Sequence, residues 1–288
     1  MQNRTKTQRT MTRWGVSLLS LLALAGCEQG LGGGFKSAPK VTLIVSGTAG
    51  GDIPVVETTD AAPQAVAGFG TIKGKVTVDG ALPTLAMKLE KGQSTKDAVC
   101  AINGVPDESV SGENGGLANV FIYLKKTPKG VDIPAAPAMP VTFDQQGCKF
   151  LPHAFIARVG QTINVKNSDP VAHNVHSFSL NKPLNSALQG NDTKGTDLIY
   201  EKAEPLPIRT VCDFHAWMDS FHLVVDHPWA VISTADGSFE IPNAPAGKQE
   251  FVVWHEKIGY VERSLKVDIV PDQVTEISVK VLAAKLSK

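Results

Sequence analysis

The 288-residue sequence has no excess of charge of either sign, because 28 Lys and Arg residues stand against 28 Asp and Glu residues. Proteins that bind nucleic acid through its phosphates carry a basic surface, so we expect no nucleic-acid partner. The sequence also lacks the long apolar runs of a polytopic membrane protein. It is 42% hydrophobic and contains 26 Gly and 18 Pro, which indicates a globular chain rich in turns and long enough for two domains.

The beginning of the chain has the pattern of an export signal. Basic residues precede a short apolar run from Val16 to Ala25, which is too short to span a bilayer and is typical of a secretory signal. The tetrad Leu-Ala-Gly-Cys that ends at Cys27 resembles a bacterial lipobox. This resemblance implies a lipoprotein signal peptide at residues 1–26 and lipidation of Cys27. The alternatives are an ordinary cleaved signal and an uncleaved anchor.

Residues 27–67 are rich in Gly, Ala and Pro and contain one short apolar patch. Such a composition cannot bury a core, so it predicts a flexible tether. Together with the lipobox, it leads us to expect a protein on the periplasmic face of the cell envelope that contacts the membrane only through its lipid anchor. Glu28 indicates the outer membrane if the source is Gram-negative.

The sequence contains only 4 Cys, and one of them begins the motif Cys212-x2-His215-x2-Met218. A thiolate, an imidazole and a thioether are soft metal ligands, and with a second imidazole they form the set that suits copper in an electron-transfer site. A structural zinc site would need more Cys or His. The second imidazole is available upstream, where His173 and His176 are three residues apart. On a strand these two side chains face opposite ways, so only one of them can reach the metal.

The stretch from Met139 to Asp226 resembles the cupredoxins, a family of small blue-copper β-sandwich proteins, and its ligand motifs are most similar to amicyanin. The resemblance implies one type 1 copper ion and no catalytic residue. Carried over residue by residue, it implies the ligands His173, Cys212, His215 and Met218. His176 is the alternative ligand if the first histidine is assigned differently.

Four further residues are expected around these ligands because of their positions. Asn174 resembles the cupredoxin Asn that ties the two ligand segments together, with Asp213 as its acceptor, and such bonds orient ligands. The aromatic rings of Phe214 and Trp217 would exclude water. Amicyanin-like loops carry Pro at the position of Phe214, and a non-proline residue there restores a backbone N–H. We expect this amide to bond to the Cys212 sulfur and to raise the reduction potential.

The flanks of this stretch contain alternating apolar and polar residues, as in residues 71–79, 265–269 and 277–281, which indicates half-buried strands. They resemble a carboxypeptidase-regulatory-like (transthyretin-like) β-sandwich. Neither flank alone has enough strands to bury two faces, so we expect residues 68–137 and 229–288 to form one sandwich. The cupredoxin, at residues 138–228, would be inserted in it or packed against it. The opposing interpretation is two sequential small domains. In both, the fold class is all-β.

Two further expectations concern a disulfide bond and a loop. If Cys27 is lipidated and Cys212 binds the metal, one pair of cysteines remains, and an exported protein meets oxidising conditions, so we expect a disulfide between Cys100 and Cys148. The competing pairing of either with Cys212 would destroy the metal site. The polar stretch from Asn181 to Asp197 predicts a solvated loop.

These patterns lead to three functional hypotheses. The first is an exported electron carrier with a redox protein partner, either a cytochrome or a dehydrogenase. The second is a copper-binding or copper-storing lipoprotein, and the third is a structural or carbohydrate-binding surface lipoprotein that uses the cupredoxin as a scaffold. Enzyme activity is not expected, because a copper ion whose four positions are filled has no open position for a substrate.

Overall fold

The computed structural model describes residues 68–287. The predicted signal peptide, Cys27 and the predicted tether lie outside the described residues. The described residues form sixteen strands and two short 3-10 helices. None of their helices is long and apolar enough to cross a membrane. The all-β fold class is therefore confirmed.

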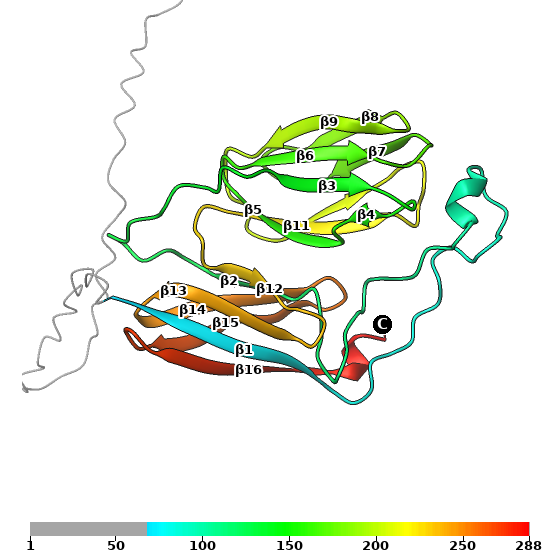
Figure 1. The fold of residues 1–288 in the computed structure, drawn as a ribbon. Coiled ribbons are helices and arrows are strands. Elements are labelled where there is room, and N and C mark those ends of the chain that lie inside the picture. Colours follow the sequence, from blue (N-terminus) through cyan, green and yellow to red (C-terminus); the bar gives the residue numbers. More distant parts are fainter. Residues whose placement is uncertain (1–67, 288) are drawn as a thin grey trace, which may run out of the picture. The chain divides into compact units, whose positions relative to one another are not determined.

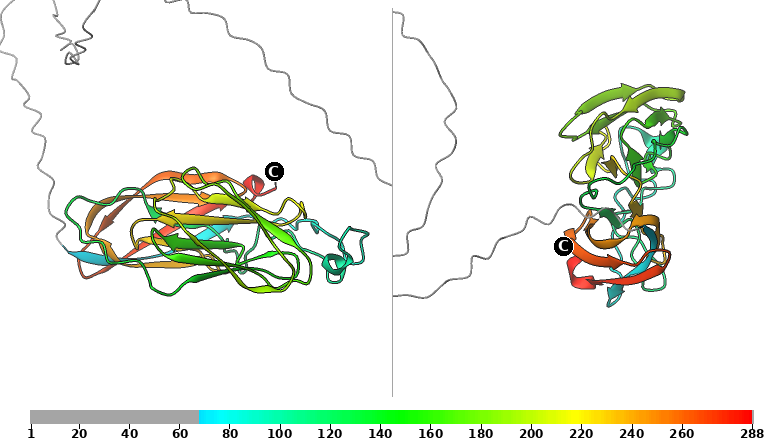
Figure 2. Two further views of the ribbon diagram at one scale, coloured as in Figure 1. Left: turned by 90° about the horizontal axis from the view of Figure 1, so that it is seen from above. Right: turned by 90° about the vertical axis from the view of Figure 1, so that its left-hand side faces the viewer.

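One group of strands forms two facing sheets made from both ends of the described chain (Figures 1 and 2). The first sheet has the order β13 (Ser238–Pro245), β1 (Phe69–Asp79), β16 (Val274–Leu282). The second has the order β12 (Ala230–Ile232), β2 (Phe121–Leu124), β14 (Gly247–His255), β15 (Gly259–Ile269). Alternate residues of these strands bury one apolar core that includes Ile72, Val76, Ile241 and Phe251. We call this group the flanking sandwich.

The second group is drawn in green to yellow in Figure 1 and also forms two sheets. One sheet has the order β4 (Phe150–Leu151), β3 (Val141–Gln145), β6 (Thr162–Asn167), β9 (Asp192–Ile199). The other has the order β5 (Ala154–Arg158), β11 (Asp219–Val225), β10 (Ile208–Val211), β7 (His173–Ser177), β8 (Leu184–Leu188). A separate core, with Phe143, Phe150 and Ile163, lies between them. We call this group the central sandwich.

The order of the strands along the chain relates the two groups. β2 and β12 are adjacent antiparallel strands of one sheet, with Tyr123 opposite Ala230. All the strands of the central sandwich, β3 to β11, lie in sequence between them. The residue limits predicted for the domains remain predictions.

The two sandwiches share a third apolar cluster. Successive side chains of a strand point to opposite faces, and β2 uses both faces: Ile122 and Leu124 pack in the flanking core, whereas Phe121 and Tyr123 pack against Leu223 of β11. This explains why β2 is buried at all four positions and reads as an unbroken apolar run in the sequence.

The prediction of a solvated loop from Asn181 to Asp197 is wrong. This stretch contains β8 and most of β9, and β8 pairs with β7 from Leu184 to Leu188. Both strands are at sheet edges and each buries only one residue, so polar residues are tolerated there. Their polarity reflects exposure and not the lack of regular structure.

The long segment between β1 and β2 reaches from the flanking sandwich to the central one (Figure 1). It contains the 3-10 helix η1 (Ala98–Ala101), and Cys100 of this helix forms a disulfide with Cys148, between β3 and β4. The predicted disulfide is confirmed. The two cysteines are 48 positions apart in the sequence, and closure of this loop stabilises the fold by about 4 kcal/mol on the chain-entropy model.

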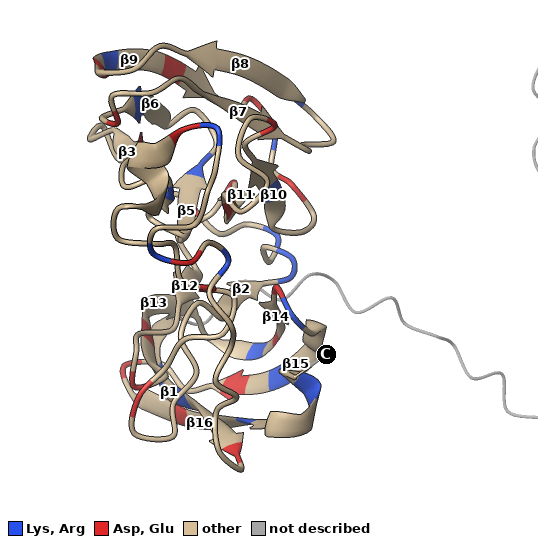
Figure 3. Ribbon diagram, turned by 90° about the vertical axis from the view of Figure 1, so that its right-hand side faces the viewer, with Lys and Arg blue, Asp and Glu red and all other residues tan. Residues whose placement is uncertain are grey.

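Charged residues of both signs are interspersed on both sandwiches in the view of Figure 3. This agrees with the equal numbers of basic and acidic residues in the sequence.

Candidate metal centre

Three predicted ligands meet at one end of the central sandwich. His173 is the first residue of β7, and Cys212 and His215 lie in the connection between β10 and β11. The Nδ1 atoms of the two imidazoles are 2.8 Å apart, and they lie 3.9 and 3.7 Å from the Cys212 sulfur. The exposed fractions of the three residues are 0, 2 and 1%, so water has little access to the cluster.

The two ends of the connection that carries Cys212 are held together by strand pairing. Val211 and Asp219, on either side of it, are paired residues of β10 and β11. The amide of Cys212 donates to the Met218 carbonyl at 3.2 Å, and the amide of Met218 donates to the His215 carbonyl at 2.9 Å. A short loop with both ends fixed by a sheet holds its side chains in a defined geometry.

Met218, the expected thioether ligand, is 1% exposed and belongs to the same apolar cluster as Cys212. The structure therefore buries all four expected ligands in one region of the core. His176 points away from it: its Nδ1 lies 3.0 Å from Asp213 Oδ1, and its side chain is about one third exposed.

The electrostatics of the cluster favour a thiolate. Burial raises the pKa of the Cys212 thiol, but hydrogen bonds from His173 and His215 and from the amides of Asn174 and Phe214 lower it more, to about 6. Burial lowers the pKa of His173, but hydrogen bonds with Asp169 and Cys212 raise it to about 9. The thiolate, which is the form that binds metals, is therefore present at neutral pH.

Two carboxylates that were not predicted contact the outer nitrogens of the imidazoles. Asp169 Oδ2 lies 2.9 Å from His173 Nε2, and Asp97 Oδ2 lies 2.9 Å from His215 Nε2. Burial raises the pKa of Asp169, but hydrogen bonds from His173 and from two backbone amides, those of Cys148 and Gly147, leave it below its usual value. Asp169 precedes His173 by four residues, which is a weak local signal, whereas Asp97 is 118 residues away from His215 in the sequence and shows none.

Of the residues expected around the ligands, all but Phe214 lie where they were predicted. The Asn174 amide donates to the Cys212 sulfur at 3.5 Å, and the Trp217 ring lies 5.1 Å from the His215 ring. Asn174 also contacts Asp213, whose pKa is lowered by hydrogen bonds from His176, Asn185 and Asn174. The side chain of Phe214 is 47% exposed, contrary to its expected role in excluding water. Of the two expected aromatic residues, Trp217 is the one whose ring packs against a ligand.

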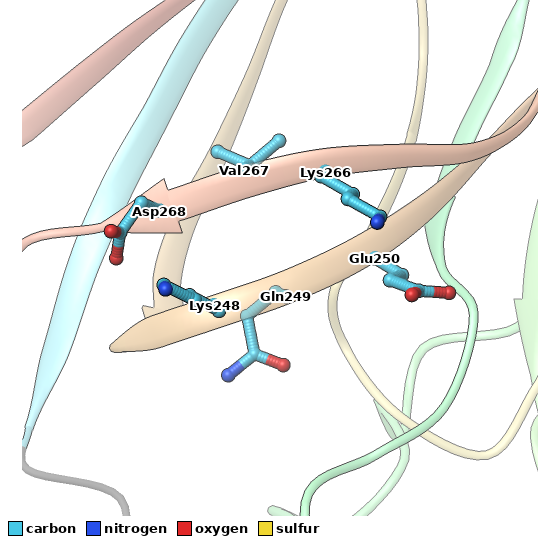
Figure 4. A pocket seen from close by; sticks show the side chains of 6 residues that line it. All are labelled: Lys248, Gln249, Glu250, Lys266, Val267 and Asp268. Carbon is cyan, nitrogen blue, oxygen red and sulfur yellow. The ribbon is translucent and has the colours of Figure 1, made fainter.

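Within residues 68–287, the other group of possible metal ligands is Cys148, Asp169 and His173, and its cysteine is in the disulfide. A surface hollow over β14 and β15 is lined by charged side chains from the two strands (Figure 4). They form opposite-charge pairs across the ladder, Lys248 with Asp268 and Glu250 with Lys266, and such pairs stabilise a sheet.

The described chain resembles solved cupredoxin structures over about a third of its length. A purple cupredoxin from Nitrosopumilus maritimus is 22% identical, with 29% of this chain and 98% of that chain covered and a TM-score of 0.25. Amicyanin from Paracoccus versutus is 18% identical, with 36% and 96% covered and a TM-score of 0.26.

A copper-containing nitrite reductase from Thermus scotoductus SA-01 is 20% identical, with 34% of this chain covered and a TM-score of 0.27. The match spans 25% of the length of that reductase. No family model matches the sequence, and no curated protein does.

Proposed function

We propose that this protein binds one type 1 copper ion and carries single electrons between redox partners outside the cytoplasm. The observation that supports this most strongly is the buried cluster of one thiolate and two imidazoles. Their ring and sulfur atoms face one another, and Met218 is buried in the same region. One Cys and two His with a thioether are the ligands of blue-copper electron-transfer sites.

The two sulfur-to-nitrogen distances in the cluster fit a metal ion. For metal bonds of about 2.0 Å to nitrogen and about 2.3 Å to sulfur, atoms in a trigonal arrangement lie about 3.5 to 3.7 Å apart. The two sulfur-to-nitrogen distances, 3.7 and 3.9 Å, agree with this arrangement. The two Nδ1 atoms, 2.8 Å apart, are about 0.7 Å closer than this arrangement requires, so the imidazoles would have to move apart.

When bound, copper would supply a centre that gains and loses one electron. The residues of the chain would bind it through His173, Cys212, His215 and Met218. Strand pairing fixes both ends of the β10–β11 connection, and the ligands are buried. These two features would keep the geometry of the ligands nearly unchanged between oxidation states. A small rearrangement favours rapid electron transfer.

The remaining parts of the proposal concern the location of the protein, its partner and enzyme activity. A disulfide is typical of proteins in oxidising compartments, so the bond between Cys100 and Cys148 supports export. We propose a lipid-anchored location on the periplasmic face, with a cytochrome or a dehydrogenase as the partner. We expect no enzyme activity, since four protein ligands would leave no open position on the metal.

The proposal is tested by adding Cu(II) to the purified protein and recording its visible absorption and electron paramagnetic resonance spectra. We expect an intense absorption band from thiolate-to-copper charge transfer and a narrow copper hyperfine splitting. Voltammetry should then show a reversible one-electron couple.

Two variants control this experiment. Cys212→Ser should lose the band, because the hydroxyl cannot replace the thiolate. His176→Ala should keep it, because His176 faces away from the cluster. Copper binding without a reversible couple would instead support copper storage, and a protein that binds no copper would support a scaffold role.

A further inference from the structure

The disulfide joins the two carboxylates that contact the imidazoles. Asp97 lies three residues before Cys100, and the Cys100 amide donates to the Asp97 carbonyl at 3.0 Å. On the other side of the disulfide, the Cys148 amide donates to the Asp169 carboxylate at 2.7 Å. The neighbouring Gly147 amide donates to the second oxygen of the same carboxylate, also at 2.7 Å. A continuous chain of bonded groups therefore runs from Asp97 through the disulfide to Asp169.

Each carboxylate contacts the nitrogen of an imidazole that faces away from the cluster. A neutral imidazole, the form that binds a metal, presents the lone pair of Nδ1 on its other side when it donates its Nε2–H to a carboxylate. This is the side on which Nδ1 of His173 and Nδ1 of His215 face Cys212. A carboxylate in this position orients the ring and strengthens it as a ligand.

Asp97 and Asp169 belong to different parts of the fold. Asp169 precedes β7 in the central sandwich, whereas Asp97 belongs to the long segment between β1 and β2, two strands of the flanking sandwich. His215 is 1% exposed although it lies in a surface connection, and Asp97 occupies its outer nitrogen. The side chain of Asp97 is itself 25% exposed, so it lies between the imidazole and the solvent.

We infer that the segment between β1 and β2 contributes to the metal centre. Its Asp97 is a positioning residue that orients His215 and shields it from water. The disulfide holds Asp97 in place and connects it to Asp169, which positions His173. This inference rests on the proposed copper site, and it assigns to the flanking sandwich a part in tuning that site.

The decisive variant is Asp97→Asn, which keeps the size of the side chain and removes its charge. We expect the affinity for copper to fall about 10- to 100-fold, as is typical when an outer-shell partner of a metal-bound histidine is lost, and copper to pass correspondingly faster from the loaded variant to a chelator than from the wild type. We also expect a higher reduction potential, because removing a negative charge near the metal disfavours the Cu(II) form.

A matched control is Glu90→Gln, because Glu90 is exposed in the same segment and its loss changes the net charge equally. It should leave the release rate and the potential unchanged. The double variant Cys100→Ser with Cys148→Ser should accelerate release in the same direction as Asp97→Asn, because it frees the segment. It also provides the test if Asp97→Asn does not fold.

The outcomes separate this inference from the proposal on which it rests. A wild-type protein that takes up no copper, or shows no thiolate band, overturns the proposed function. A wild type that shows the band, together with an Asp97→Asn variant whose release rate and potential match it, overturns the inference alone.

Discussion

Asn174 and Asp213 are joined by a reciprocal pair of hydrogen bonds. The Asp213 amide donates to Asn174 Oδ1 at 2.6 Å, and Asn174 Nδ2 donates to Asp213 Oδ2 at 2.8 Å. Asn174 follows the ligand His173 and Asp213 follows the ligand Cys212, so this pair fastens the two ligand segments to each other beside the sulfur. The Asn174 amide adds a bond to that sulfur at 3.5 Å.

Replacing Asn174 by Ala should therefore weaken both the fold and the site. We expect the free energy of unfolding to fall by about 1 to 3 kcal/mol, because the partner groups of a buried side chain are left unpaired. Chemical denaturation of the metal-free protein measures this change. Asn164→Ala is the matched control, since Asn164 bonds to Asp197 at an exposed part of β6 and β9. Equal losses for the two variants would contradict the prediction.

Phe214→Pro should lower the reduction potential of the copper-loaded protein. The Phe214 amide is among the groups that lower the pKa of Cys212, and proline has no N–H. Without this donor, the sulfur gives more charge to the metal and stabilises Cu(II). Voltammetry measures the shift. Phe214→Ala keeps the amide and removes the same exposed ring, so it should keep the potential of the wild type. A potential that moves equally in both variants would assign the effect to the ring.

The buried His222 should make the protein sensitive to acid. Its Nε2 lies 2.9 Å from the Tyr200 hydroxyl and its ring stacks on Phe155, and burial lowers its pKa from 6.5 to about 3. The unfolded chain therefore binds a proton in this interval that the folded chain does not, so stability is lost as the pH falls from 6.5 towards 3. Other buried histidines, His227 and His255, also have lowered pKa values and add to this loss.

His222→Phe removes one of these groups while keeping an aromatic ring in the core. We expect the melting temperature of this variant to fall less steeply between pH 6.5 and acid conditions than that of the wild type. Thermal melts at a series of pH values measure both slopes. Parallel curves for the two proteins would show that His222 does not contribute.

Leu223 of β11 should hold the two sandwiches together. It is 0% exposed and packs with Phe121, Tyr123 and Trp254 of the flanking sandwich. Leu223→Ala is expected to cost about 2 to 5 kcal/mol of stability, the usual range for a cavity in a packed core. Leu282→Ala, at a position that is 52% exposed, should change stability by less than about 0.5 kcal/mol. Denaturation curves compare the two, and a small loss at Leu223 would show that this interface relaxes around the cavity.

Local spacing alone was sufficient to place part of the candidate site. Cys212, His215 and Met218 belong to one short connection between paired strands, so neighbours in the sequence remain neighbours in space. The odd offset between His173 and His176 separates their side chains, because successive residues of a strand alternate between its faces, and the structure places them on opposite sides. The regular alternation in β1, β15 and β16 identified these strands for the same reason.

Only the tertiary structure decided which groups surround the ligands. Asp97 reaches His215 across 118 residues because the disulfide and the β1–β2 segment bring it there, and no pattern of spacing records such a contact. The same limit applies to β8 and β9, whose polar residues show that they are exposed without showing whether they are strands. It also applies to the histidines, since the burial of His222 depends on the side chains packed around it. Sequence determines the chemistry that is available and the local geometry, whereas long-range packing determines the partners of each charged group and therefore its electrostatics.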